Sequence, residues 1–291
     1  MIEIAICLAI IGVGLVAIIG VLPIGMRTQR DNREETIINQ DATVFTEAIR
    51  NGTRGLDDLT NYVYAITNYW TIYPSLVTGV NGYTYAGSSF PITNGVRIIG
   101  LLSTPEYAAT NTFYPLGSIA SGSYVSNHVV AYVRSLSGPA VEKPPQLNGS
   151  LIRQSSFSYG LMCENLPVGI YTPPLWQSSQ KYNPGDSVTY VLNGQTTYWQ
   201  ATANTAASDI PGQSALWVRN AYTQELAANL HELRLTFLWP LLPDSQPPRI
   251  HYGTGHQTYR TLIAGRQVLD TNTAPNLNLY FFQSQSFTNA P

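Results

Sequence analysis

The first 26 residues constrain this chain more than any other stretch. From Met1 to Leu22 they carry one charged side chain, that of Glu3. A helix over these residues, rising 1.5 Å per residue, is roughly 33 Å long, enough to cross a hydrocarbon core of about 30 Å. The stretch lacks the basic start, short apolar core and small-residue cleavage site of a secretory signal peptide. The sequence therefore predicts a helix that spans a membrane.

Glu3 and a repeated apolar motif give this stretch a more specific likeness. An acid in an apolar run costs about 2.5–3.5 kcal/mol near a bilayer centre, and a cation beside it offsets that cost. The letters AIIG occur at Ala9–Gly12 and again within AIIGVLP at Ala17–Pro23. Together these features make the first 50 residues similar to the N-termini of type IV pilins and type II secretion pseudopilins. The acid is third here and fifth in the mature sequences of that family.

This resemblance implies a structural subunit and no enzymatic activity. In the family, a prepilin peptidase removes a leader in the bacterial inner membrane and the new N-terminus is methylated. Assembly machinery then packs the N-terminal helices into a helical homo-oligomer, an extracellular pilus or a periplasmic pseudopilus, and the acid neutralises the N-terminal amine of the adjacent subunit. The residues that the likeness assigns to subunit assembly are Met1, Glu3, Ile4, Leu8, Ile11, Gly12, Leu15, Ile19 and Pro23.

Three other interpretations stay open. The apolar helix also fits an ordinary membrane anchor. A minor pseudopilin at the tip of a secretion assembly would share the motif and be present once per assembly. A membrane-anchored glycan-binding surface protein would be monomeric and would bind polysaccharide. Gly12, Gly14 and Gly20 favour helix packing over a plain anchor, because glycine is a poor helix former that lets helices approach closely.

The composition argues against several other classes of protein. Only 11% of the 291 residues are charged and the net charge is −2, so nothing suggests a nucleic-acid partner. The four histidines and two cysteines, Cys7 and Cys163, show no metal-ligand spacing. Nucleophile-elbow, phosphate-loop and dinucleotide motifs are absent from the sequence. We therefore expect no catalytic residue, no metal, no cofactor and no disulfide between the two cysteines.

The residues after Pro23 predict that the helix continues to about residue 50. Arg27 and Arg30 stand four residues before Asp31 and Glu34, a spacing that places opposite charges together on a helix. Apolar residues then recur at helical spacing with one polar interruption, Asp41. Asn51-Gly52 provides a stop signal, and Gly55–Thr67 predicts a second, shorter helix.

The remainder predicts an α+β fold in which this helix packs on an antiparallel β-rich head. We divide the chain into the helix (1–52, hydrophobic and protruding over 1–26), the head (53–172 and 221–291) and an inserted module (173–220). His251 and His256 are placed in a loop. The predicted strands of the head are Val96–Leu102, His128–Arg134, Leu151–Met162, Leu233–Trp239, Gln257–Ile263 and Leu277–Phe282.

Residues 173–220 predict a small all-β module, with a strong hairpin signal at Asn193-Gly194. Its spacing is similar to that of the short chitin- and cellulose-binding modules of bacterial chitinases and cellulases. That family binds sugar with exposed aromatic rings, but Ala203 and Asn204 occupy the corresponding positions here. Either the module is a scaffold that has lost glycan binding, or Trp176, Trp199 or Trp217 binds a polysaccharide. The residues that match the family are Trp176, Tyr182, Gly185, Asp186, Val188, Tyr190, Gly194, Tyr198, Ala201, Pro211 and Trp217.

Overall fold

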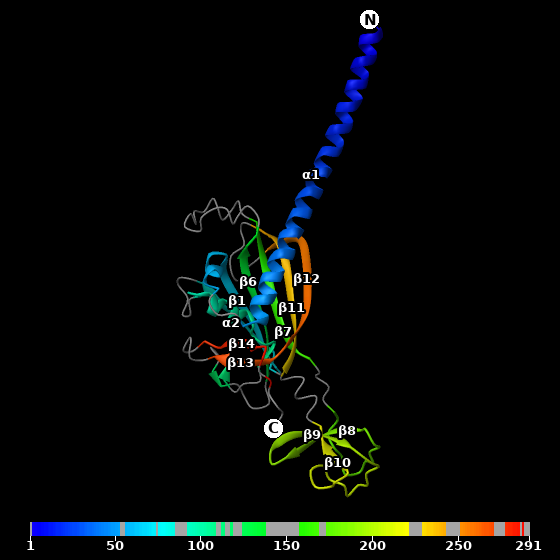
Figure 1. Ribbon diagram of the computed structural model, residues 1–291, viewed down its shortest axis with the longest axis vertical. Helices are drawn as coiled ribbons and strands as arrows, with labels where there is room; N and C mark the ends of the chain where they lie inside the picture. Colours follow the sequence, from blue (N-terminus) through cyan, green and yellow to red (C-terminus); the bar gives the residue numbers. More distant parts are fainter. Residues whose placement is uncertain are drawn as a thin grey trace.

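A long N-terminal helix, a β-rich head and a small β module make up the computed structural model (Figure 1). Helix α1 (Ile2–Arg50) projects from one end of the head, and the module lies at the opposite end. This arrangement confirms the predicted α+β class. The residues that the structure describes are 2–52, 56–73, 75–84, 92–108, 112–113, 117–118, 124–137, 157–168, 173–220, 229–242, 251–270, 277–285 and 287.

Helix α1 is continuous over 49 residues, but only its second half is packed on the head. The buried side chains of that half recur every three or four residues and include Ile38, Phe45 and Ile49, so one face of the helix meets the core. The helix ends at Arg50, and Gly52 then adopts a φ of +54°. A Cβ at Gly52 would collide with the carbonyl oxygen of Phe282, which is why glycine fits this stop.

An antiparallel seven-stranded sheet forms the head, in the order β12-β11-β7-β6-β1-β2, with β3 also paired to β6. In β11, inward residues such as Leu235 and Phe237 alternate with outward ones such as Thr236, as a strand with one face on the core requires. The strands are β1 (Val63–Tyr73), β2 (Val77–Thr84), β3 (Tyr107–Ala108), β6 (Tyr124–Arg134), β7 (Ser158–Pro167), β11 (Leu230–Leu241) and β12 (Tyr252–Ala264).

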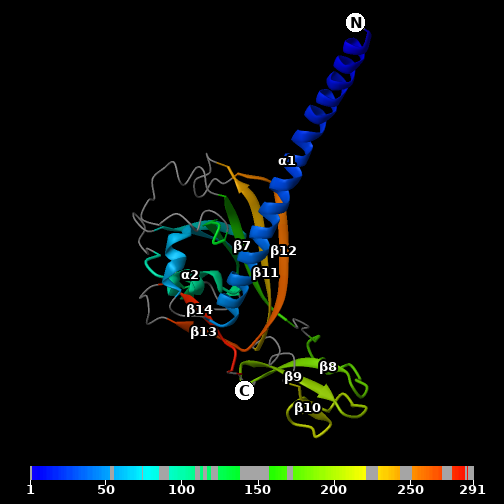
Figure 2. The ribbon, with the colours of Figure 1, turned by 45° about the horizontal axis from the view of Figure 1, so that its top comes forward.

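One face of this sheet is covered by α1, by the short helix α2 (Gly95–Leu102) and by the hairpin of β13 (Arg266–Asp270) and β14 (Leu279–Gln283) (Figure 2). Their apolar side chains join those of the sheet in one cluster. On the opposite face, Tyr132 is fully buried among neighbours that include Tyr64 and Met162. A second hairpin joins β4 (Thr112–Phe113) to β5 (Gly117–Ser118).

Two predicted elements of the head have the wrong secondary structure. Most of Gly55–Thr67 is not an α-helix: a 3-10 helix at Asp57–Asn61 leads into β1, whose β-branched and aromatic residues are typical of a strand. Val96–Leu102 is not a strand but belongs to α2. The Asn94 side chain caps α2 by accepting a hydrogen bond from the Arg97 N–H, at 3.0 Å.

The loop predicted at His251–His256 is also wrong, because strand β12 begins at Tyr252. Gly253 and Gly255 signal close packing here, since a Cβ at either position would overlap Pro240 or Trp239 of the neighbouring strand. The predicted strand Leu151–Met162 is shifted: its first residues lie outside the described part of the chain, and β7 starts at Ser158. The other predicted strands fall within or overlap β6, β11, β12 and β14.

The module is inserted between β7 and β11, which are neighbours in the sheet. The Val168 N–H donates to the Leu230 carbonyl at 2.9 Å, so the chain leaves and returns without interrupting the sheet. Asn193 and Gly194 form the predicted hairpin turn, with φ of 51° and 79°. The module's own sheet contains β8 (Ser187–Leu192), β9 (Gln195–Ala201) and β10 (Trp217–Arg219).

Candidate functional site

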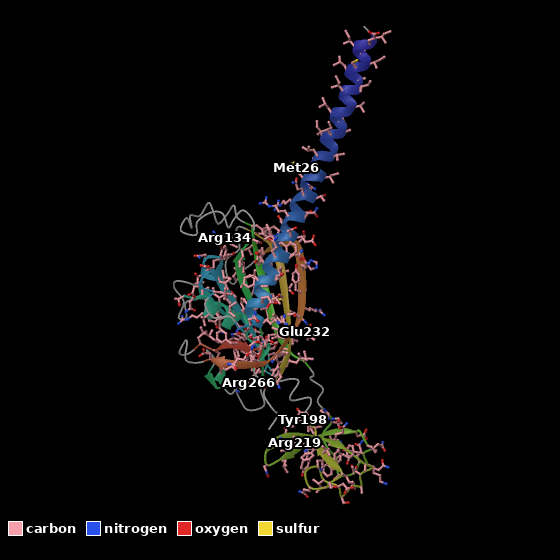
Figure 3. The ribbon with its side chains drawn as sticks, in the orientation of Figure 1. Met26, Arg134, Tyr198, Arg219, Glu232 and Arg266 are labelled. Atoms are coloured by element: carbon pink, nitrogen blue, oxygen red, sulfur yellow. The ribbon has the colours of Figure 1, made fainter. Side chains whose placement is uncertain are left out.

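The first half of α1 exposes apolar side chains in every direction. Figure 3 shows them radiating from the helix between its N-terminal end and Met26. Residues 2–26 extend about 37 Å along the axis, and α1 is the one helix among the described residues that is long and apolar enough to cross a membrane. The exposed large side chains are Ile2, Ile4, Ile6, Leu8, Ile10, Ile11, Val13, Leu15, Val16, Ile18, Ile19, Val21, Leu22, Ile24 and Met26.

The predicted assembly residues from Glu3 to Pro23 all lie on this protruding half, and Met1 lies outside the described residues. Five of them share one stripe, because their spacing of three or four residues keeps side chains on one face of a helix. Gly12 and Pro23 lie at the edge of this stripe, and Glu3 lies outside it. The stripe consists of Ile4, Leu8, Ile11, Leu15 and Ile19.

The Glu3 carboxylate has no ion-pair partner among the described residues. The next charged residue along the helix is Arg27, about 36 Å away along the axis. A cation that neutralises Glu3 in an apolar environment must therefore come from the chain terminus or from another molecule.

Asp41 anchors the second half of α1 to the head. This carboxylate is fully buried and accepts three hydrogen bonds: from the Leu136 N–H at 2.9 Å, the Ser137 hydroxyl at 2.7 Å and the Tyr159 hydroxyl at 2.8 Å. Burial raises the pKa of Asp41, and the three donors partly oppose that rise because they stabilise the carboxylate. Burial and the neighbouring carboxylate also hold the pKa of Tyr159 well above its usual value.

A second tyrosine fixes the same part of the helix from β12. The Tyr259 hydroxyl donates to the Asn39 side chain. Phe237 lies between the two tyrosines, with its ring centroid 5.3 Å from Tyr159 and 5.5 Å from Tyr259. This aromatic row of Tyr159, Phe237 and Tyr259 places a hydroxyl on each side of α1 where the helix enters the head, which fixes the direction in which the apolar half projects.

In the sequence, Asp41 stands out only as an interruption of the apolar face of the predicted helix. An acid on the buried face of an amphipathic helix is a detectable signal, because a buried carboxylate requires donors. The donors themselves lie about 95 to 118 residues further along the chain and belong to elements whose placement depends on the whole sheet.

The three tryptophans of the module face inward to different degrees. Trp217 is buried, and its indole N–H donates to the Asp209 carbonyl at 2.9 Å. Trp199 is half-buried beneath Gly212, while Trp176 meets Tyr190 edge to face at 5.6 Å. Both pack against a core of Tyr182, Val188, Ala201 and Trp217. The module therefore uses these rings first to build its own core.

The described residues hold no cluster of three or more potential metal ligands. Cys7 is exposed on the apolar half of α1 and Cys163 is buried in β7, and neither forms a disulfide. Burial raises the pKa of Cys163, so its thiol is a small apolar filler of the core. Two acidic side chains of α1 stand out among the described residues. Glu3 lies in an apolar run without an ion-pair partner, and Asp41 is fully buried and accepts three hydrogen bonds.

No protein-family model, no curated protein and no solved structure matches this chain. The pilin likeness consequently depends on the N-terminal residues alone.

Proposed function

We propose that this chain is a subunit of a pilin-like helical filament, held in a membrane by α1 before assembly. One observation carries the proposal: a head with its own closed core presents an apolar helix of about 37 Å with an acid near its start. Burying one Leu or Ile side chain fully contributes about 1.5–3 kcal/mol. Fifteen large apolar side chains in water therefore require an outside partner, which is lipid or other apolar helices.

Glu3 favours other copies as the final partner. A permanent lipid anchor gains nothing from a carboxylate in its apolar run, and the acid makes insertion less favourable. In a bundle of copies, the same carboxylate can pair with the N-terminal amine of a neighbour. A buried carboxylate without a partner is costly, so packings that leave Glu3 unpaired are disfavoured. The acid thereby selects one axial register among many that apolar contacts alone would allow.

The proposal includes the processing and placement that the family likeness implies. The subunit would be processed by a prepilin peptidase in a bacterial inner membrane, and assembly machinery would extract it into a pilus outside the cell or a pseudopilus in the periplasm. The packed helices replace lipid around the apolar half of α1, so extraction leaves its side chains out of water. The head, closed by its own core, would line the outside of the filament.

Substitution of Glu3 tests the proposal. Glu3→Gln removes the charge at nearly constant size, and Glu3→Ala removes the side chain. We expect both variants to insert in membranes at least as well as the original chain and to yield few or no filaments in sheared cell-surface material viewed by negative-stain microscopy. Asp31→Asn, at an exposed acid beyond the apolar run, is the matched control and should assemble normally. Undiminished filaments in Glu3→Gln would contradict the proposal.

Two further measurements on the original chain, its copy number per assembly and its retention on polysaccharide, separate the alternatives. A protein found once per assembly would be a minor pseudopilin. A protein that stays monomeric in the membrane and is retained on insoluble polysaccharide would be a surface glycan-binding protein.

A further inference from the structure

The seven-stranded sheet of the head has an edge strand at each end of its strand order. Among the strands that the structure describes, β12 and β2 each pair with another strand on one side only. Figure 1 shows β12 along one side of the head. The Ile92 N–H donates to the Thr84 carbonyl at the end of β2. The name β2 edge is therefore kept for residues 77–82, and the name β12 edge for residues 256–264.

The β12 edge presents a row of backbone groups to the outside. The Gly265 N–H donates to the Asn229 carbonyl at 2.8 Å, and bonding alternates along an antiparallel ladder. The odd-numbered residues from 257 to 265 therefore bond to the β11 side, while the even-numbered residues from 256 to 264 direct their N–H and C=O groups outward. None of these outward backbone groups bonds to another described residue. The row is about 27 Å long.

Both edges lack the features that usually protect an exposed edge strand, which are lysine, proline, other charges and bulges. Residues 77–82 read VTGVNG, without a charge or a proline, and in residues 256–264, HQTYRTLIA, Arg260 is the one Lys, Arg, Asp or Glu. The irregularity of the β11–β12 ladder lies between Trp239 and Leu241, opposite residues that precede the β12 edge. An unprotected edge of this length can pair with a strand of another chain.

The turn into β2 carries an apolar residue that the head does not bury. Leu76 has a φ of +55° and is 65% exposed. Turns with this conformation usually contain glycine, asparagine or aspartate, because other side chains are strained there. Val77 and Val80, which follow it on the β2 edge, are exposed as well. Contact with a partner outside the head would bury these three side chains and give the strained turn a role.

The strand directions determine how two copies can join. Every neighbouring pair from β12 to β2 is antiparallel, so the two edge strands run in opposite directions. When two copies stand side by side with their α1 helices pointing the same way, β12 of one therefore runs antiparallel to β2 of the other. Pairing of like edges would turn one copy over. Its α1 would then point the opposite way or lie on the opposite face of the joined sheet.

We infer that the β12 edge of one copy pairs with the β2 edge of the next copy, so that their sheets join. Helix α1 covers the same face of every sheet (Figure 2), so all the helices lie on one side of the joined sheets. Because the joint uses two different edges, it continues from copy to copy, as an open helical assembly requires. The inference rests on the proposed function, since it needs neighbouring copies that point the same way.

Paired cysteines in the full chain test this edge joint. Val80→Cys is combined in turn with a cysteine on the β12 edge, in a Cys7→Ala background, since Cys163 is buried. All the chosen side chains project from the sheet face away from α1, because Tyr83 and Ile263 on the same strands face the core. The β12 substitutions are His256→Cys, Thr258→Cys, Arg260→Cys and Leu262→Cys.

The matched control combines Val80→Cys with Gln200→Cys, at an exposed residue of the module. Filaments are oxidised, dissolved in denaturant and separated on gels without reductant. Within one copy the two edges are five strand spacings apart, about 24 Å, which is too far for a disulfide inside the chain.

The expected product is a ladder of dimers, trimers and longer oligomers, because each copy carries one cysteine at each edge. One of the four pairs should exceed the Gln200→Cys control by at least about tenfold, since a disulfide forms only between Cα atoms within about 7 Å. Val80→Cys alone should give no oligomer. Dimers of that single variant would indicate pairing of like edges and overturn the inference, as would four pairs no higher than the control.

A lysine on either edge gives a second test, which does not depend on the register of the joint. Val80→Lys and Leu262→Lys place a charge at exposed positions, as natural edges do to prevent pairing. Each should leave the thermal unfolding of the head unchanged and lower the filament yield at least about threefold. Val191→Lys, at an exposed valine on the edge strand β8 of the module, is the control and should assemble normally.

These experiments separate the edge joint from the proposed function. Suppose that the original chain forms filaments and Glu3→Gln abolishes them, while both lysine variants assemble normally and no cysteine pair exceeds its control. The edge joint is then wrong and the proposed function stands. If the original chain forms no filaments, the proposed function is wrong and the edge joint with it.

Discussion

The two halves of α1 belong to one continuous helix, yet they depend on different partners. Residues 2–26 are apolar and exposed, whereas the second half alternates polar and apolar residues and buries Ile38, Phe45 and Ile49 in the head. The more apolar half is thus the one that the fold leaves uncovered. A uniformly apolar helix has no preferred face for docking on a sheet, while a helix with one apolar face does. The stability of the head should therefore depend on the second half of α1, and assembly on the first.

The largest expected effect comes from truncating the docked half. Phe45 is fully buried between the helix and the sheet, so Phe45→Ala should lower the free energy of unfolding of the head by about 3–5 kcal/mol. Leu15→Ala, a similar truncation on the protruding half where Leu15 is 54% exposed, should leave it unchanged. Urea denaturation of the detergent-solubilised chain measures both. Equal losses of stability in the two variants would show that the stability of the head depends on both halves of α1.

Removal of the buried charge should have the next largest effect. In Asp41→Asn, one of the three donors to Asp41 would meet an amide N–H in place of an acceptor oxygen. We expect a loss of about 1–3 kcal/mol in the free energy of unfolding, the usual cost of an unsatisfied buried group. Glu47→Gln, at an exposed acid on the same helix, is the control and should be nearly neutral. A neutral Asp41→Asn would mean that the three hydrogen bonds do not anchor the helix.

The free energy of unfolding of the original chain and of Asp41→Asn should also depend differently on pH, in a direction that the pKa of Asp41 predicts. Since the pKa of Asp41 is raised in the folded head, the folded state binds a proton more tightly than the unfolded state. The resulting contribution to stability is fully present below the unfolded pKa of about 3.9 and is lost as pH rises through the folded value. Relative to Asp41→Asn, the original chain should lose stability over that window, by at most about 1.4 kcal/mol per pH unit. If the stability of both proteins changed with pH in the same way, the pKa of Asp41 would not be raised in the folded head.

The sequence correctly predicts those parts of the fold that depend on local residue spacing. The continuous helix, its stop near Gly52 and the hairpin at Asn193-Gly194 follow from residue spacing and from backbone freedom at glycine and asparagine. The interpretation of Val96–Leu102 as a strand failed because its β-branched residues outweighed the capping Asn94 and a packed apolar face. A short apolar segment fits either structure until its surroundings are known.

The anchor of α1 was beyond the reach of sequence reasoning for a different reason. Asp41, Ser137 and Tyr159 come together only because β6 and β7 are neighbours in the sheet and α1 crosses the face they share. The Tyr159–Phe237–Tyr259 row likewise needs the register of three strands. Such long-range pairings depend on the complete topology, whereas the exposed apolar half of α1 requires only its own composition.

The smallest effect is expected at the junction of the two halves, where Arg30 and Glu34 form an ion pair of 2.7 Å. The Arg30 side chain is 68% exposed and that of Glu34 13%, and pairs four residues apart on a helix surface contribute only about 0.3–0.5 kcal/mol. A double-mutant cycle of Arg30→Gln and Glu34→Gln, followed by urea denaturation, should give a coupling in that range that falls with added salt. A coupling above about 1 kcal/mol would be too large for an exposed pair and would show that the head shields the pair from water on the Glu34 side. Because both residues belong to α1, the pair stabilises the helix itself, whereas Asp41 and the aromatic row hold α1 where it enters the head.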